Sequence, residues 1–295
     1  MKVSTLIITR NEELTLPACL AALAWCEDIV VLDSGSTDRT VEIAYASGAR
    51  VLSRPFDTFA AQRNYGLDHG RLRNDWVLHL DADEIVTSEF VDALGHLEPA
   101  PGVDGYLIPS KTMLFGQWLR HAGMYPTYQV RLGHRERLRF VQVGHGQREN
   151  ALPDRIAVFD HPYLHDSFAN GMEAWLQKHL RYAEDEAGRT SARQGIRGPG
   201  AGGGRTQRRR ALKRYADCLP LWSRPLARFA YVYVWRQGFR DGRAGLVYAL
   251  MLAVYEGMIA VFGYDKRFGR RGGSPAKGGS VEACRREGRA GGVRA

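Results

Sequence analysis

The first eighty residues alternate between short apolar runs rich in β-branched side chains and segments whose apolar residues recur at helical spacing. This alternation is typical of a parallel sheet with helices on both faces, because each helix carries the chain back to start the next strand. We therefore predict an α/β fold, a three-layer α/β/α sandwich, with residues 76–80 as a central strand beside residues 29–32. The expected strands are residues 3–8, 29–32, 50–53 and 76–80, and the expected helices are 14–25, 40–46 and 59–67.

Polar clusters stand directly after three of these expected strands. They occupy residues 9–12, 33–38 and 81–84. The carboxyl ends of parallel strands lie at one edge of the sheet, and ligands of such sheets bind in a crevice at that edge. We therefore expect the three clusters to converge on one binding site.

The third cluster is the most acidic, since DWVLHLDADEIV places Asp81, Asp83 and Glu84 within four residues of an apolar strand. Ionised carboxylates repel one another and are costly to bury unpaired, so the cluster requires an arginine, a proton or a metal ion nearby. Two aspartates one residue apart suit Mg²⁺ or Mn²⁺, which prefer oxygen ligands and often share the phosphate oxygens of a substrate. A surface turn without a metal is the alternative interpretation.

Two further side chains also have both a binding and a structural interpretation. Arg63, in the helix that precedes the acidic strand, could neutralise a diphosphate or form a surface salt bridge. Asp33 could accept hydrogen bonds from a nucleoside, or it could cap the helix that follows it.

The character of the chain changes after residue 102. Further β-type runs follow, then a helical segment at residues 171–187, a Gly/Arg-rich stretch and a long apolar helical region. The β-type runs are residues 105–109, 128–132 and 138–143. We predict a main domain over residues 1–190, a flexible loop over 191–211, a helical and membrane-associating extension over 212–268, and a disordered basic tail over 269–295.

Positive charge is concentrated in two stretches of the C-terminal half. Residues 189–214 hold nine Lys/Arg and no Asp/Glu, and residues 266–295 hold nine Lys/Arg against two acids, while the whole chain carries +9. These stretches suit an anionic membrane surface, nucleic acid or plain solvation. No helix-turn-helix, RNP or zinc-finger pattern supports nucleic acid, so we expect no nucleic-acid partner.

The expected location is the cytoplasm, on the inner face of the cell membrane. The four cysteines show neither metal-ligand spacing nor a disulfide framework, and the apolar run at the N-terminus is too short for a signal peptide. Residues 244–263 are long enough to span a bilayer, but a single span would export the Arg-rich tail, against the usual preference for basic segments in the cytoplasm. We therefore favour peripheral attachment over a span.

Four stretches in a fixed order resemble family 2 glycosyltransferases of the GT-A fold, and most closely the bacterial lipopolysaccharide-core β-glucosyltransferases. They are ITRNEE, VVLDSGSTDRT, RNYGL and HLDADE, and the likeness extends with lower specificity through HPYLHDSF and GFRDG. The chain departs from the family in two places. Asp33-Ser34 stands where most members have two adjacent acids, and in VGHGQRE the residues His145 and Glu149 are separated where the subgroup commonly has a His-Glu pair.

The resemblance implies a GT-A-type, Rossmann-like domain that transfers a sugar from a nucleotide-sugar donor, a UDP-sugar, with inversion. It implies that Mg²⁺ or Mn²⁺ on Asp81 and Asp83 holds the donor diphosphate. The implied catalytic base is Glu149, then His145, then Asp166. The implied donor-binding residues are Thr9, Asn11, Glu12, Asp33, Arg63 and Asp81.

The acceptor is expected to meet residues 110–170 and to be a glycan or glycolipid of the bacterial cell envelope, such as lipopolysaccharide core. Flat aromatic faces in this region suit sugar rings, although each ring has core packing as its alternative interpretation. Together with the basic, apolar C-terminus they suggest an acceptor that is both glycosidic and anchored in the membrane. The side chains expected at the acceptor are Trp118, Tyr125, Tyr128, Phe140, Arg120, His121 and Arg131.

Three other functions compete with sugar transfer. A phosphatase or phosphotransferase that uses Asp-x-Asp carries it on the first strand, followed by Gly-Thr, whereas here it follows the fourth strand and precedes Glu-Ile. A nucleotidyltransferase begins with a glycine-rich loop, and ITRNEE has no glycine. An inactive scaffold of the same fold is the third alternative, although it has less reason to keep both Asp81 and Asp83.

Overall fold

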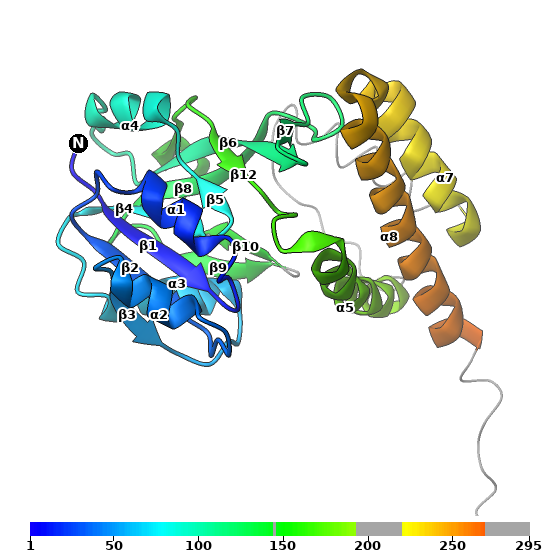
Figure 1. The fold of residues 1–295 in the computed structure, drawn as a ribbon, viewed down its shortest axis with the longest axis horizontal. Helices are drawn as coiled ribbons and strands as arrows, with labels where there is room; N and C mark the ends of the chain where they lie inside the picture. The colour runs from blue at the N-terminus through cyan, green and yellow to red at the C-terminus, as the bar shows by residue number, and fades with distance from the viewer. Residues whose placement is uncertain (144–145, 193–219, 269–295) are drawn as a thin grey trace, which may run out of the picture.

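The computed structural model describes residues 1–143, 146–192 and 220–268 (Figure 1). Its main sheet begins with four parallel strands that alternate with helices, as the sequence pattern predicts. The expected bounds of the second helix and third strand are reproduced residue for residue. In chain order the elements are β1 (Ser4–Thr9), α1 (Leu16–Ala22), β2 (Ile29–Asp33), α2 (Thr40–Ala46), β3 (Arg50–Ser53), α3 (Phe59–His69) and β4 (Trp76–Asp81).

The later strands extend the same sheet on the far side of β4. The path of neighbouring strands is β3-β2-β1-β4-β8-β6-β12-β5, with β7 and β11 pairing with β6, and β9 and β10 form a separate hairpin. These later elements are β5 (Glu84–Ile85), α4 (Ser88–Gly95), β6 (Gly105–Leu114), β7 (Gln117–Trp118), β8 (Thr127–His134), β9 (Phe140–Val143), β10 (Gly146–Glu149), η1 (Pro153–Arg155), β11 (Ile156–Val158) and β12 (Tyr163–His165).

One expected strand pairing is wrong. Residues 76–81 form a central strand, but β1 lies between β4 and β2, since Ile7 is in register with Val31 on one side and with Leu80 on the other. The chain starts in the middle of the sheet, winds outward through β2 and β3, and then returns to the other side of β1. This order is that of a doubly wound sheet, whose first strand is internal.

Helices cover both faces of the sheet, which confirms the predicted three-layer α/β class. Successive side chains of a strand point to opposite faces, so Ile7 contacts one apolar cluster and Leu6 the other. The first cluster includes the buried faces of α1 and α4, among them Leu16 and Phe90. The second cluster includes Ala60 and Leu67 of α3 and Phe140 of β9.

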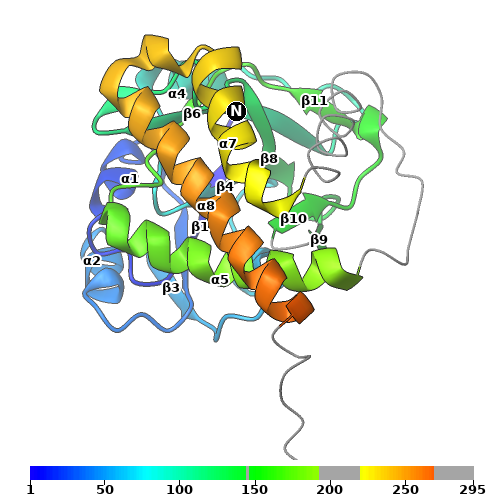
Figure 2. The ribbon, with the colours of Figure 1, turned by 90° about the vertical axis from the view of Figure 1, so that its right-hand side faces the viewer.

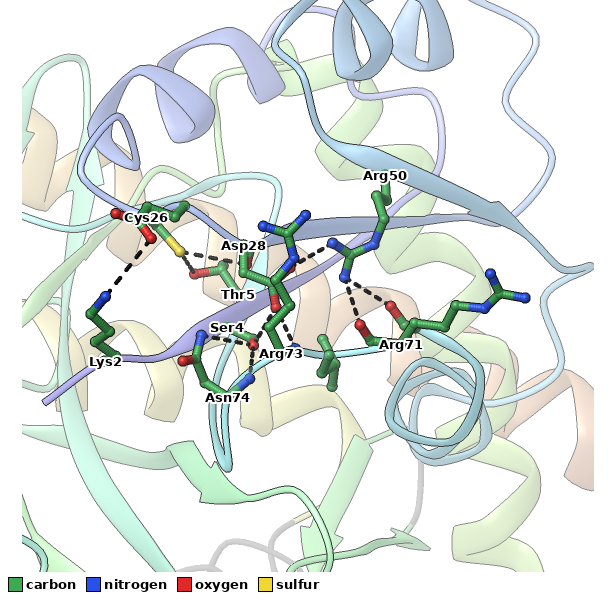
Figure 3. A network of polar contacts seen from close by, with 12 residues as sticks. Lys2, Ser4, Thr5, Cys26, Asp28, Arg50, Arg71, Arg73 and Asn74 are labelled. Atoms are coloured by element: carbon green, nitrogen blue, oxygen red, sulfur yellow. Dashed lines mark hydrogen bonds and ion pairs between the residues drawn. The ribbon is translucent and has the colours of Figure 1, made fainter.

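A buried carboxylate holds the amino ends of the parallel strands together (Figure 3). Asp28, directly before β2, accepts hydrogen bonds from the Ser4 hydroxyl (2.5 Å), the Arg50 guanidinium (2.6 Å) and the Arg73 backbone N–H (2.8 Å). Asn74 in turn donates its backbone N–H to the Ser4 hydroxyl at 3.0 Å. One side chain thereby links the starts of β1, β2 and β3 to the loop before β4.

The C-terminal helices form a layer beside the carboxyl ends of these strands (Figures 1 and 2). The long helix α8 packs on α5 and α7, and the three share an apolar cluster that contains Trp175, Val232 and Leu252. Asp241 joins this layer to the sheet, because its buried carboxylate accepts the backbone N–H groups of His121 (2.9 Å) and Ala122 (2.8 Å). The helical elements are α5 (Gly171–Ala192), η3 (Leu221–Ser223), α7 (Arg224–Phe229), a π-helical stretch η4 (Ala230–Trp235), η5 (Gly238–Asp241) and α8 (Gly242–Phe268).

Parts of the predicted domain organisation stay predictions. The predicted loop over residues 191–211 falls outside the described residues from 193 onward, and so does the predicted tail over 269–295. Of the described helices, the stretch Gly238–Phe268 is by length and composition apolar enough to cross a membrane, and an 18-residue window within it has a mean hydropathy of 1.9.

We expect Asp28→Asn to lower the free energy of unfolding by about 3 kcal/mol, because it removes the partner of a half-buried guanidinium. The measurement is urea denaturation at neutral pH. Asp57→Asn is the matched control. It breaks the exposed ion pair with Arg54 and should cost less than about 1 kcal/mol.

The same carboxylate predicts an acid dependence. Burial alone raises the pKa of Asp28, but hydrogen bonds from Ser4, Arg73 and Arg50 offset burial and hold it below the ordinary value. A depressed folded pKa stabilises the protein above the unfolded pKa and loses that contribution as the pH falls through the folded pKa. The stability difference between the native chain and Asp28→Asn should therefore shrink at acidic pH, and an unchanged difference would contradict this role.

Candidate active site

Two loops are tied together at the carboxyl ends of β1 and β2. Asp33 accepts the backbone N–H groups of Gly35 and Ser36 at 2.9 Å and the Thr9 hydroxyl at 3.3 Å. Asn11, which has a φ of +56°, accepts the Thr37 N–H at 2.8 Å. Thr9, Asn11 and Asp33 are therefore brought together as predicted, and in the described state they shape the loop that a nucleoside would meet.

The acidic cluster after β4 is neutralised chiefly by two arginines. The Asp81 carboxylate accepts from Arg63 at 2.7 Å through one oxygen and from Arg131 at 2.7 Å through the other, and Arg131 also pairs with Glu84. Arg63, Arg131 and Glu84 are all buried. Arg63 was named from the sequence, whereas Arg131 was expected at the acceptor. That expectation for Arg131 is wrong, because β8 lies beside β4 and places its guanidinium beneath the acidic turn.

The pKa values of Asp81, Arg63 and Glu84 are shifted by burial and by one another's charges. Burial raises the pKa of Asp81, but Arg131 and Arg63 more than offset burial, so its pKa lies well below the usual range. Burial lowers the pKa of Arg63 to about 10 even though Asp81 acts in the opposite direction. Burial raises the pKa of Glu84, partly against the effect of Arg131.

The Asp83 carboxylate pairs with a histidine rather than with an arginine. Its carboxylate lies 3.4 Å from Nε2 of His165, and its carbonyl accepts the Asp166 backbone N–H at 2.9 Å. Burial alone lowers the pKa of His165, but the Asp83 carboxylate, with Glu84 and Asp81, raises it to about 9. The antiparallel pairing of β12 with β5 creates this contact, since His165 is in register with Glu84.

His165 is the side chain that sequence reasoning missed. It stands in HPYLHDSF, a stretch included in the family resemblance, but only its neighbour Asp166 was named as functional. The signal was a histidine at the end of a short β-type run. Its partner is 82 positions earlier in the chain, and only the sheet order reveals it.

Glu12 connects the crevice to the start of the helical layer. Its carboxylate accepts from the Thr15 hydroxyl at 2.7 Å and from the Asn170 amide at 2.8 Å, next to the first residue of α5. Burial raises the pKa of Glu12 and the charge of Asp83 adds to the effect, while the hydrogen bonds and Lys178 act against them. Glu12 therefore lies near Asp83 and beneath α5.

The three candidate bases lie in different places. Asp166 follows His165 and is partly buried, and burial, aided by the charge of Asp83, raises its pKa. Glu149 ends β10, in the hairpin where it is in register with Phe140, and no contact in the described ranges joins it to Asp83 or His165. His145 lies outside the described residues.

The expected acceptor side chains are only partly at the surface. Phe140 is buried against His79 (ring centroids 4.9 Å apart), so its expected role as a sugar platform is wrong. Trp118 contacts Tyr125 edge to face, and Arg120 lies over the Trp118 ring. The remaining ones, Tyr128 and His121, keep at least part of their surface exposed.

The ligand set for a metal is incomplete within the protein. In the described ranges no group of three or more His, Cys, Asp or Glu side chains is placed to hold a metal ion. Asp83 and His165 are a pair, and both oxygens of Asp81 are bound by guanidinium groups. A cation at this turn would therefore need donors from a ligand. Each Asp81 oxygen accepts one guanidinium bond and the side chain is 33% exposed, so Asp81 keeps lone pairs that such a cation could use.

Comparison with known proteins agrees with this site. The family model Glycosyl transferase family 2 matches residues 4–134. Residues 4–134 are thus similar to a glycosyl transferase family 2 domain. The match covers β1 to β8 and includes the acidic turn, Arg63 and Arg131.

The relatives are bacterial. An uncharacterized glycosyltransferase of Rickettsia typhi is 36% identical over 107 residues, 36% of this chain and 36% of that protein. A lipopolysaccharide core biosynthesis glycosyltransferase of Rhizobium meliloti is 29% identical over 153 residues, 50% of this chain and 53% of that protein. The chain thus aligns with only about a third of the length of its Rickettsia relatives.

Among solved structures, the glucosyl-3-phosphoglycerate synthase of Mycobacterium tuberculosis, in complex with Mn²⁺, uridine diphosphate and glucosyl-3-phosphoglycerate, matches with a TM-score of 0.44 and 24% identity. This match covers 68% of this chain and 82% of that one.

The two aspartates of the acidic turn should respond differently to substitution. Asp81→Asn should lower the free energy of unfolding by about 3 kcal/mol or more, because it leaves the buried Arg63 without its charge partner. Asp83→Asn should cost only about 1 kcal/mol, because His165 can release its proton when its partner is lost and an arginine cannot. Urea denaturation of both variants makes the comparison, and equal losses would contradict the assignment.

Proposed function

We propose that this chain is an inverting glycosyltransferase that moves a sugar from a nucleotide-sugar donor, a UDP-sugar, to a saccharide or lipid-linked acceptor. The observation that carries the proposal is the convergence, at the carboxyl ends of β1, β2 and β4, of the loops that hold Thr9, Asn11 and Asp33 and of the Asp83–His165 pair. Thr9, Asn11, Asp33 and Asp83 lie within residues 4–134, which the family model matches, whereas His165 lies beyond them.

In this proposal the donor diphosphate and a divalent cation bind at the acidic turn, beside Asp83 and His165. Asp83 supplies a carboxylate oxygen, the ligand type that Mn²⁺ and Mg²⁺ prefer. His165, 3.4 Å away, could add an imidazole nitrogen only after releasing its proton, so we propose that metal binding displaces that proton, and this mixed donor set suits Mn²⁺ better than Mg²⁺. With only two protein ligands, the ion would need diphosphate oxygens, so we propose that it binds together with the donor. When bound, the cation offsets the negative charge that develops on the departing nucleoside diphosphate.

Arg63 and Arg131 play a supporting role in this proposal. Both are buried and both hold Asp81, so they orient the acidic turn rather than reach the donor directly. Their positive charge keeps Asp81 ionised, and both Asp81 and Asp83 keep part of their side-chain surface exposed.

For the base that removes the acceptor proton, we propose Asp166. It is the candidate whose backbone contacts Asp83, and burial raises its pKa toward the range where a carboxylate accepts protons well. Glu149 ranks second because it lies on the β9–β10 hairpin, apart from this pair.

For the acceptor, we propose a saccharide of the bacterial cell envelope, such as lipopolysaccharide core. Support comes from the similarity to the Rhizobium meliloti enzyme, named for lipopolysaccharide core biosynthesis. It also comes from the partly exposed rings of Trp118 and Tyr125, with Arg120 beside them. Sugars pack on such rings, and phosphorylated or acidic sugars pair with arginine.

Calorimetry should show Mn²⁺ binding to the full chain only in the presence of uridine diphosphate. Asp83→Asn and His165→Ala should each remove that binding, whereas Asp166→Asn should retain it because it holds no metal in this assignment. Mn²⁺ binding without the nucleotide, or unchanged binding in both variants, would contradict the shared site.

Asp166→Asn should reduce sugar transfer by about a hundredfold or more, the usual contribution of a general base. The dissociation constant for the donor should be unchanged, which separates loss of the base from loss of binding. Glu149→Gln is the comparison variant and should retain most activity; the reverse result would assign the base to Glu149. Release of inorganic phosphate from the donor would instead favour a phosphatase, and donor binding without turnover would favour an inactive scaffold.

A further inference from the structure

The outward face of α8 is an apolar stripe. Its exposed large apolar residues recur three, four or seven positions apart along the helix, which places them on one side. The opposite side holds Ala249, Leu252 and Ile259, which are buried against the rest of the protein. The exposed residues are Leu246, Leu250, Val254, Val261, Tyr264 and Phe268.

The segment from η3 to η5 widens this stripe into a surface. It runs antiparallel to α8, since Leu221 lies against Gly263 and Pro225 against Gly257. Figure 2 shows α7 and α8 side by side at the front of the molecule, on the side away from α4 and the N-terminus in Figure 1. The exposed large apolar side chains of the segment from η3 to η5 are Trp222, Leu226, Val234, Trp235 and Phe239, and Trp235 is 80% exposed.

The charge of this layer is positive. Residues 220–268 contain seven Lys/Arg and three Asp/Glu, a net charge of +4. Of the three acids, Asp241 is buried and Glu256 pairs with Arg224, so they hardly offset the positive surface. Arg240 and Arg243 are exposed at one end of the α7–α8 layer, and Arg267 is exposed at the other.

The other side of α8 packs against the rest of the protein. Its buried side chains share a cluster with Trp175 of α5, and Lys266 donates to the Glu184 carbonyl at 2.6 Å, so α5 follows α8 along much of its length. α5 itself exposes Lys178, Arg181 and Glu184. A helix that crossed a bilayer here would draw this charged helix into hydrocarbon, which is costly.

From the stripe, the aromatic residues, the flanking arginines and the packed inner side, we infer that the α7–α8 layer docks flat on an anionic lipid bilayer. The apolar side chains enter the boundary between headgroups and acyl chains, and the arginines contact lipid phosphates. Aromatic side chains such as Trp222 and Trp235 suit this depth. The inference goes beyond sugar transfer and holds whatever the enzyme transfers.

The test is flotation of the purified full chain with vesicles of phosphatidylglycerol and phosphatidylethanolamine, compared with phosphatidylcholine vesicles. The double variant Leu226→Glu/Val261→Glu replaces side chains that are 70% and 68% exposed. It should lower partition onto the anionic vesicles about tenfold or more, since it places two charges in the apolar surface. The matched control Leu152→Glu/Val158→Glu replaces a leucine and a valine that are 64% and 57% exposed outside the helical layer, and should bind like the native chain.

Four further measurements complete the test: binding of an arginine variant, carbonate extraction, oligomer mass and thermal unfolding. Arg240→Gln/Arg243→Gln should weaken binding to anionic vesicles and leave binding to phosphatidylcholine unchanged. Alkaline carbonate should release the bound chain, and resistance to carbonate would overturn flat docking in favour of a span. Equal vesicle binding by the apolar double variant and the native chain would overturn the inference. A lower oligomer mass in that variant, without a change in vesicle binding, would instead assign the face to contacts between copies of the chain. Thermal unfolding of each variant confirms that it is folded.

Discussion

The buried ion pairs beneath the acidic turn are the constraint on which the site depends. Three carboxylates cannot gather at the end of a buried strand unless cations enter with them. Arg63 from α3 and Arg131 from β8 meet at Asp81, so one helix and one later strand must both be in place before the turn can form. A network of this kind adds little net stability, since burial of each charge opposes the attraction, but loss of one member is costly.

The sheet is held at its two ends by different means. At the amino ends Asp28 gathers several hydrogen bonds and links the strand starts. At the carboxyl ends Arg63, Arg131 and Glu84 are buried, while the side chains of Asp81, His165 and Asp83 are 33%, 27% and 18% exposed. The buried arginines hold the acidic turn from below, and the partly exposed side chains of Asp81, Asp83 and His165 are available to a ligand. This division keeps a binding site precise without requiring the ligand to hold it together.

The helical layer lies on one side of the sheet, at the carboxyl ends of its parallel strands (Figures 1 and 2). The carboxyl ends of the parallel strands point toward α5, and the α7–α8 face lies beyond it (Figures 1 and 2). Glu12 and Asn170 join the crevice to α5, and Asp241 joins α8 to the loop that carries His121. If the outer face rests on a bilayer, the crevice is held at a defined distance and orientation from that surface. A lipid-linked acceptor would benefit from this arrangement, because docking restricts its search to two dimensions.

The sequence by itself determined the local elements of the first eighty residues and the edge at which the polar clusters meet. Alternation of strand and helix patterns is a local property, so it can be read from neighbouring residues, and α2 and β3 were predicted residue for residue. The convergence of residues 9–12, 33–38 and 81–84 on one edge of the sheet followed from the rule that parallel strands share a carboxyl edge.

Only the tertiary structure decided which charges neutralise which. Arg131 is 50 positions from Asp81 and His165 is 82 positions from Asp83, and each arrives on a strand whose place in the sheet depends on long-range pairing. The same pairing buried Phe140 and placed β1 between β2 and β4. Strand order depends on packing over the whole chain rather than on any local pattern. The sequence therefore showed that the carboxylates need cations, and the fold determined that two of them meet arginines while Asp83 meets a histidine.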